Sequence, residues 1–227
     1  MTAPPDAAGP ALARWGWAVA AAFALGGITV AAWGPRLPEI KASLGVGPAA
    51  LGLLLVGVTV GGIAGLLASA PVLSLLGSRR ALAGSILLLA AGLGLMGLTA
   101  AVGSTALIAV AFVVIGTGIG VLDVLINVEG AAVERAAGRT LLPVMHAAWS
   151  FGVAAGSGIG AACAALGVTP AAQFAGEAVA ITAAGFLIAA GIPAGRRGPQ
   201  AQPRPRSRPR RAEALRQWLR GWADWRL

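Results

Sequence analysis

Asp123 and Asn127 are the polar residues whose types and spacing most suggest chemistry. They follow an uncharged run from Thr105 to Ile119 and lie four positions apart, so they share one helical face. A carboxylate inside a bilayer is costly and usually faces a helix bundle or a wet cavity, where it can carry a proton or bind a polar solute. We predict that this face points away from lipid. The alternative is that the helix ends near Ile126 and that Asp123 is an inner-leaflet anchor or a partner for a loop arginine.

Three further positions are candidates for binding or coupling. Glu177 is the other ionisable residue inside an apolar segment, and it is either a cavity-facing group or an outer-interface carboxylate. His146 can either couple transport to protons or serve as a structural hydrogen-bonding residue. Trp33 and Arg36 close the first apolar segment, where we expect an aromatic-belt tryptophan and interfacial charge.

The sequence shows no catalytic constellation. It has one histidine, one cysteine (Cys163), no nucleophile motif, no phosphate-binding loop and no metal-ligand spacing. We therefore expect no enzyme activity, no cofactor, no metal site and no intramolecular disulfide.

The composition indicates a membrane protein. Of 227 residues, 57% are hydrophobic and only 11% are charged, which is too little polar surface for a soluble domain. The net charge of +9 does not predict nucleic-acid binding, because it is concentrated near the C-terminus. Residues 196–227 contain ten arginines and two acids, whereas residues 1–195 contain seven basic and six acidic groups.

Six apolar segments are long enough to cross a bilayer as helices. We therefore predict an all-α integral membrane protein with six transmembrane helices and a basic cytoplasmic tail. Period-2 alternation, typical of a barrel, is absent. The first segment is too long for a cleaved signal peptide. The segments span about residues 15–33, 51–76, 81–102, 105–128, 144–168 and 171–192.

Charges in the connecting loops predict the orientation. With both termini in the cytoplasm of a bacterium, the inner side of the plasma membrane holds most of the basic loop residues and the outer side holds Arg36 and Lys41. This is the positive-inside pattern. Glu129 and Glu134 are expected in the cytoplasm beside Arg135 and Arg139. The basic residues assigned to the inner side are Arg14, Arg79, Arg80, Arg135, Arg139, Arg196 and Arg197.

Small residues form two regular faces. Gly57, Gly61 and Gly65 recur every four positions, as do Gly152, Gly156 and Gly160. Such faces allow another helix to approach closely. They serve either tight packing alone or packing that also lets helices rock during transport.

The predicted domain organisation has four parts. Residues 1–14 form a cytoplasmic N-terminal segment, and residues 15–195 form the six-helix transmembrane domain. Residues 196–211 form an Arg/Pro-rich linker. Residues 212–227, "AEALRQWLRGWADWRL", form either an amphipathic Trp/Arg helix at the membrane surface or a disordered tail.

Several strings resemble the major facilitator superfamily (MFS). "GSRRAL" is similar to part of its loop motif between helices 2 and 3. "WGPRLPEI" and "DVLINVEGAAVERAAGRTLLPVMHAAWSFG" resemble a bacterial branch related to sugar permeases. The resemblance covers about residues 15–195 and implies the N-terminal six-helix half of a twelve-helix transporter. Such a half consists of two inverted three-helix repeats, with the solute bound between the halves.

The resemblance also implies roles for individual residues. Asp123 and Asn127 match the helix 4 signature, and His146 and Ser150 match the helix 5 signature. Gly77, Arg79 and Arg80 match the cytoplasmic gating loop. The family's loop motif carries an acidic residue three positions before its glycine, where this chain has Ser74.

Three functions remain open from the sequence. The first is a transporter, or half of one, that moves a small polar solute and is coupled to protons through Asp123 or Glu177. It would require a second six-helix half, from a homodimer or a separate chain. The second is a truncated or frameshifted membrane protein that does not transport. The third is a membrane scaffold that contacts lipids through its tail.

Overall fold

The computed structural model describes residues 5–194. The predicted linker at 196–211 and the predicted surface helix at 212–227 lie outside the described residues. Within them the chain is helical and contains no strand. The elements are α1 (Pro5–Ala32), a 3-10 turn η1 (Gly34–Arg36), α2 (Leu37–Leu44), α3 (Pro48–Val102), α4 (Thr105–Ala137), α5 (Leu142–Ala165) and α6 (Pro170–Gly191).

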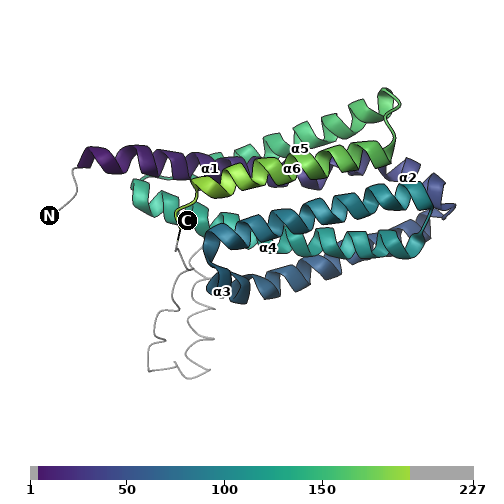
Figure 1. Ribbon diagram of the computed structural model, residues 1–227, viewed down its shortest axis with the longest axis horizontal. Helices are drawn as coiled ribbons and strands as arrows, with labels where there is room; N and C mark the ends of the chain where they lie inside the picture. The colour runs from purple at the N-terminus through teal and green to yellow at the C-terminus, as the bar shows by residue number, and fades with distance from the viewer. Residues whose placement is uncertain (1–4, 195–227) are drawn as a thin grey trace, which may run out of the picture.

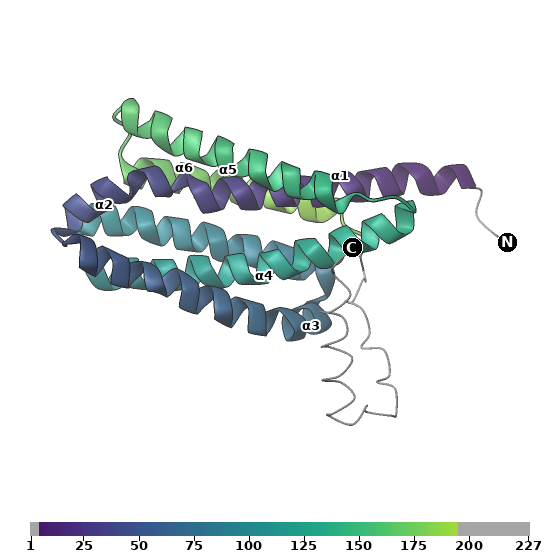
Figure 2. The same ribbon diagram turned by 180° about the vertical axis from the view of Figure 1, so that it is seen from behind.

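The helices pack side by side along one common direction, as Figures 1 and 2 show. Five helical stretches within residues 5–194 are long and apolar enough to cross a membrane. The first of these is Gly9–Leu44, and the others are α3, α4, α5 and α6. The prediction of an all-helical membrane protein is therefore confirmed.

The longest helix, α3, is broken at Gly77. A straight helix of its 55 residues would be about 80 Å long, more than twice the ~30 Å of hydrocarbon in a bilayer. Gly77 has φ 73° and ψ 163°, a region open essentially to glycine alone. The chain folds back there, and Figure 1 shows two arms, residues 48–76 and 78–102, on either side of α4.

Two helices extend further than the sequence predicted. The predicted first segment begins at Trp15, but α1 begins at Pro5, where a proline suits the first turn of a helix. The predicted fourth segment ends near Val128, whereas α4 continues for nine residues to Ala137. The first turns of α1 project beyond the rest of the bundle (Figure 1).

The two glycine faces lie where two pairs of helices pack closely against each other. A side chain at Gly61 would overlap the backbone carbonyl oxygen of Val113 in α4. A side chain at Gly156 in α5 would overlap that of Ile28 in α1. The prediction of close helix approach is therefore confirmed for both faces. The same contacts connect α1 with α5, and α4 with the first arm of α3.

Candidate functional site

The first candidate site is a polar face on α4 and α5. Asp123 is exposed and Asn127 is half-buried. Asn127 Nδ2 donates to the Asp123 backbone oxygen at 2.8 Å and to Asp123 Oδ1 at 3.3 Å. The helix continues well past Ile126, so the alternative in which it ends there is wrong. The amide therefore contacts one of the two oxygens of the exposed carboxylate.

His146 and Ser150 form the α5 part of this face. Both side chains are exposed, and Ser150 Oγ donates to the His146 backbone oxygen at 3.2 Å. The imidazole packs edge-on against Phe23 of α1, with ring centroids 5.1 Å apart. Phe23 is fully buried, so this contact holds one edge of the His146 ring against α1, while the His146 side chain as a whole remains exposed.

Helices α1, α4 and α5 converge beside this face. A Cβ added at Gly26 of α1 would lie 2.6 Å from Trp149 Cζ3 and 3.1 Å from Leu122 Cδ2. Trp149 precedes Ser150 and Leu122 precedes Asp123, so the two polar pairs lie at a similar level along the bundle. Within residues 5–194 no hydrogen bond joins one pair to the other. Helices α4 and α5 thus expose a carboxylate, an imidazole and a hydroxyl, with a half-buried amide beside the carboxylate.

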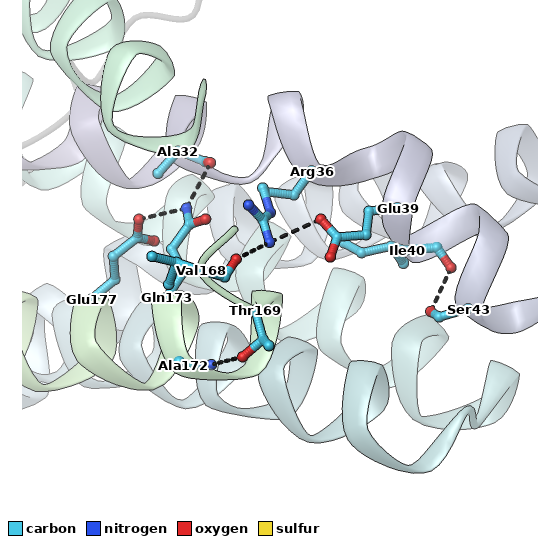
Figure 3. A network of polar contacts seen from close by, with 10 residues as sticks. All are labelled: Ala32, Arg36, Glu39, Ile40, Ser43, Val168, Thr169, Ala172, Gln173 and Glu177. Atoms are coloured by element: carbon cyan, nitrogen blue, oxygen red, sulfur yellow. Dashed lines mark hydrogen bonds and ion pairs between the residues drawn. The ribbon is translucent and has the colours of Figure 1, made fainter. Parts of the chain in front are cut away.

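The second candidate site is a buried cluster at the opposite end of the bundle, around Arg36 (Figure 3). Arg36 is only 1% exposed. Its Nη2 donates to the backbone oxygen of Val168 at 2.6 Å and forms an ion pair with Glu39 at 2.8 Å. The guanidinium therefore ties the end of α1 to the loop between α5 and α6.

Gln173 and Glu177 of α6 complete this cluster. Gln173 Nε2 donates to Glu177 Oε1 at 2.9 Å and to the backbone oxygen of Ala32 at 3.2 Å. Several buried polar atoms of the cluster have no hydrogen-bond partner, namely Trp33 Nε1, Arg36 Nε, Arg36 Nη1, Gln173 Oε1 and Glu177 Oε2. Donors and acceptors thus gather unpaired in one apolar bundle, an arrangement that ordered water or a moving proton would satisfy.

Trp33 and Arg36 face the bundle rather than lipid. The Trp33 ring is half-buried and packs against Phe112 of α4, with centroids 5.6 Å apart. Arg36 is enclosed by the contacts described above. Their expected place at the membrane interface stays a prediction.

The structure keeps the predicted residues in separate groups. Glu177 lies in the Arg36 cluster and not beside Asp123 or His146. Gly77 forms the bend of α3, and Arg79 and Arg80 are exposed just after it. Within residues 5–194, no group of three or more His, Cys, Asp or Glu residues could hold a metal ion.

Glu129 is a buried carboxylate that sequence reasoning placed in the cytoplasm. It is 4% exposed, and Trp15 Nε1 donates to its Oε2 at 2.9 Å. Ser78, next to the bend of α3, lines the same small space. Helical spacing could have predicted the burial of Glu129, because this residue falls on the same face of α4 as the buried Leu122 and Val133.

Glu134, the other acid expected in the cytoplasm, caps a helix. Its Oε2 accepts hydrogen bonds from the backbone nitrogens of Leu141 and Leu142, at 2.8 and 3.0 Å. It thereby holds the first turn of α5, whose free N–H groups need acceptors. Among the described residues, no ion pair joins Glu134 to Arg135, beside which it was expected in the cytoplasm.

The chain is similar to two bacterial transporters. It is 33% identical over 150 residues to an uncharacterized MFS-type transporter of Yersinia pestis, which covers 66% of this chain and 38% of that protein. It is 30% identical over 142 residues to an uncharacterized transporter of Sinorhizobium fredii, which covers 61% of this chain and 36% of that protein. These similarities support membership of the MFS.

The matched region spans well under half the length of either relative. No protein-family profile matches the chain, and no solved structure matches it. Together with the apolar helices, the two relatives support a multi-pass membrane protein.

Proposed function

We propose that this chain is an MFS-type transporter unit that moves a small polar solute across the bacterial inner membrane by alternating access. The observation that carries the proposal is the polar face on α4 and α5, where Asp123, His146 and Ser150 are exposed and Asn127 is half-buried, in a largely apolar bundle. Polar groups at membrane depth are expensive to expose to lipid. A face of this kind therefore needs a partner wall and an aqueous path.

In this proposal the unit crosses the membrane six times. The Gly77 break supplies the sixth crossing, because the arms 48–76 and 78–102 each exceed the ~20 residues that span a bilayer. The pairing of α1 with α5, and of α4 with the first arm of α3, supports two inverted three-helix repeats. Such repeats would pack the first helix of each against the second helix of the other.

The charge distribution supports a cytoplasmic position for both ends of the described chain. Gly191 of α6 lies close to Ala18 and Arg14 of α1, so these ends share one side of the bundle. The α3 bend, the last turn of α4 and the α4–α5 loop lie on that side too, and they contribute Arg79, Arg80, Arg135 and Arg139. The opposite side carries Arg36 and Lys41, in agreement with the positive-inside rule.

A second six-helix unit, either another copy of this chain or a separate chain, would close the solute path over the polar face. Asp123 would bind the solute or a proton there, with Asn127 orienting its carboxylate. Glu177 is the other carboxylate within a span, and we assign it to the proton path through its contact with Gln173. Gly77, Arg79 and Arg80 would form the cytoplasmic gate between the arms of α3.

Counterflow in proteoliposomes tests this function. Vesicles containing the full chain and preloaded with unlabelled monosaccharides, organic acids or amino acids would be supplied with the matching radiolabelled compound. We expect one class to exchange, with loss of exchange in Asp123→Asn and normal exchange in Arg135→Gln. Absence of exchange for every class would contradict transport by the chain as a homodimer. Equal exchange in both variants would contradict the role of Asp123.

A further inference from the structure

An apolar groove of about 410 Å³ lies between the first half of α1 and the α4–α5 connection. This volume falls in the range of small-molecule sites, about 300–1,000 Å³. Its walls are mostly apolar and include Leu12, Val133 and Met145. One charged residue, Arg139, stands among the lining residues, together with Trp17, which is 77% exposed.

The groove runs from the expected membrane surface into one leaflet. It extends along α1 from Gly9 to Ala20, about 16 Å of helix, which joins the expected cytoplasmic segment at residues 1–14 to the start of the first apolar segment at Trp15. Arg139 lies in the loop before α5 and therefore at the membrane surface, whereas Ala20 lies a dozen residues short of the other end of α1. Tryptophan and arginine at such a level are typical of contacts with lipid headgroups.

The charge of Arg139 is available to a ligand. No ion pair among the described residues involves it. The nearby carboxylate of Glu134 is instead engaged by the nitrogens of Leu141 and Leu142. A guanidinium at the mouth of an apolar groove complements a phosphate attached to an acyl chain.

We propose that this groove binds one anionic phospholipid, with its phosphate on Arg139 and an acyl chain along Leu12, Trp17 and Ala20. The site is separate from the polar face of Asp123 and does not depend on transport. Zwitterionic lipids have no net charge to match Arg139 and should occupy the groove less tightly. A bound lipid would brace the projecting start of α1 against α5.

Native mass spectrometry of the full chain tests this site. The detergent-purified protein would be mixed with equal amounts of phosphatidylglycerol and phosphatidylcholine carrying the same acyl chains. We expect the Arg139→Gln substitution to weaken phosphatidylglycerol binding about fivefold. The variant protein should therefore retain one phosphatidylglycerol molecule fewer than the unaltered chain. Arg135→Gln removes an equal charge at the same end but outside the groove, and should retain as many lipids as the unaltered chain.

A third variant separates the groove from the ten arginines of residues 196–227, which are present in every protein compared. Ala13→Phe fills the groove from an exposed position on α1 and should remove one lipid without altering any charge. Equal losses in the two arginine variants, or unchanged binding in both Arg139→Gln and Ala13→Phe, would overturn the proposal. A lipid-free dimer would also overturn it, because a second copy would then fill the groove.

Discussion

Arg36 is the residue whose environment departs furthest from the expectation for its type. A charged side chain is rarely enclosed unless it is paired, and here Glu39 and the carbonyl of Val168 provide the pairing. Because Glu39 is itself 50% exposed, the ion pair is partly screened by solvent. The hydrogen bond to Val168 should therefore contribute more to stability than the ion pair.

Substituting Arg36 and Glu39 in turn separates the contribution of the ion pair from that of the hydrogen bond to Val168. Arg36→Met leaves a carbonyl without its donor and should lower the stability by about 1–3 kcal/mol. Glu39→Gln should cost less than about 1 kcal/mol. The melting temperatures of the two purified variants in detergent measure the difference. Equal shifts would mean that the ion pair, and not the Val168 contact, holds this end of the bundle.

Glu134 offers a second test at the scale of one residue. Glu134→Ala removes the acceptor of two backbone N–H groups at the start of α5 and should therefore lower the melting temperature of the protein. Arg135→Ala, on the neighbouring exposed position, should change the melting temperature little. If both variants behave alike, Glu134 does not cap α5.

Glu129 shows why individual sites are harder to predict than helices. From the sequence, a glutamate just past an apolar run indicates the cytoplasm. In the structure α1 and α4 both extend beyond the predicted segments, and Trp15 of one meets Glu129 of the other. The contact joins residues 114 positions apart, and local hydropathy carries no signal of it.

Among the elements, the helices themselves were largely predictable. Each apolar segment corresponds to a helix or to one arm of α3, because backbone groups in lipid must bond within their own segment. Helix α2 was not predicted, since "LPEIKASL" has only eight residues and is mixed in polarity. The paired faces of Gly61 and Gly156 were visible in the sequence, but their partner helices were not.

Because α5 packs closely against α1 on one face only, alanine substitutions at two nearby glycines of α5 should change the stability in opposite directions. A methyl group at Gly156 would meet the backbone of Ile28, so Gly156→Ala should destabilise the protein by about 1–3 kcal/mol. At Gly158 the added atom would meet nothing within 4 Å. Gly158→Ala should stabilise the helix by about 0.5–1 kcal/mol. Melting temperatures that shift in the same direction would contradict this packing.

At the scale of the whole molecule, polarity distinguishes two kinds of exposed surface. Many large apolar side chains are exposed, such as Leu187 at 78%, and these suit contact with lipid. The face of Asp123 and Ser150 is exposed but polar. A membrane transporter needs such a difference, because one surface must remain in lipid while another lines an aqueous path.

Cysteine labelling tests this difference most directly. In a Cys163→Ala background, Ser150→Cys and Leu187→Cys would be treated in inside-out membrane vesicles with a membrane-impermeant maleimide. Ser150 lies eight residues, about 12 Å, into α5, whereas Leu187 lies only about 6 Å from the end of α6. We expect rapid labelling at 150 and none at 187, because water reaches the polar face. Labelling at 187 without labelling at 150 would contradict an aqueous path along α4 and α5.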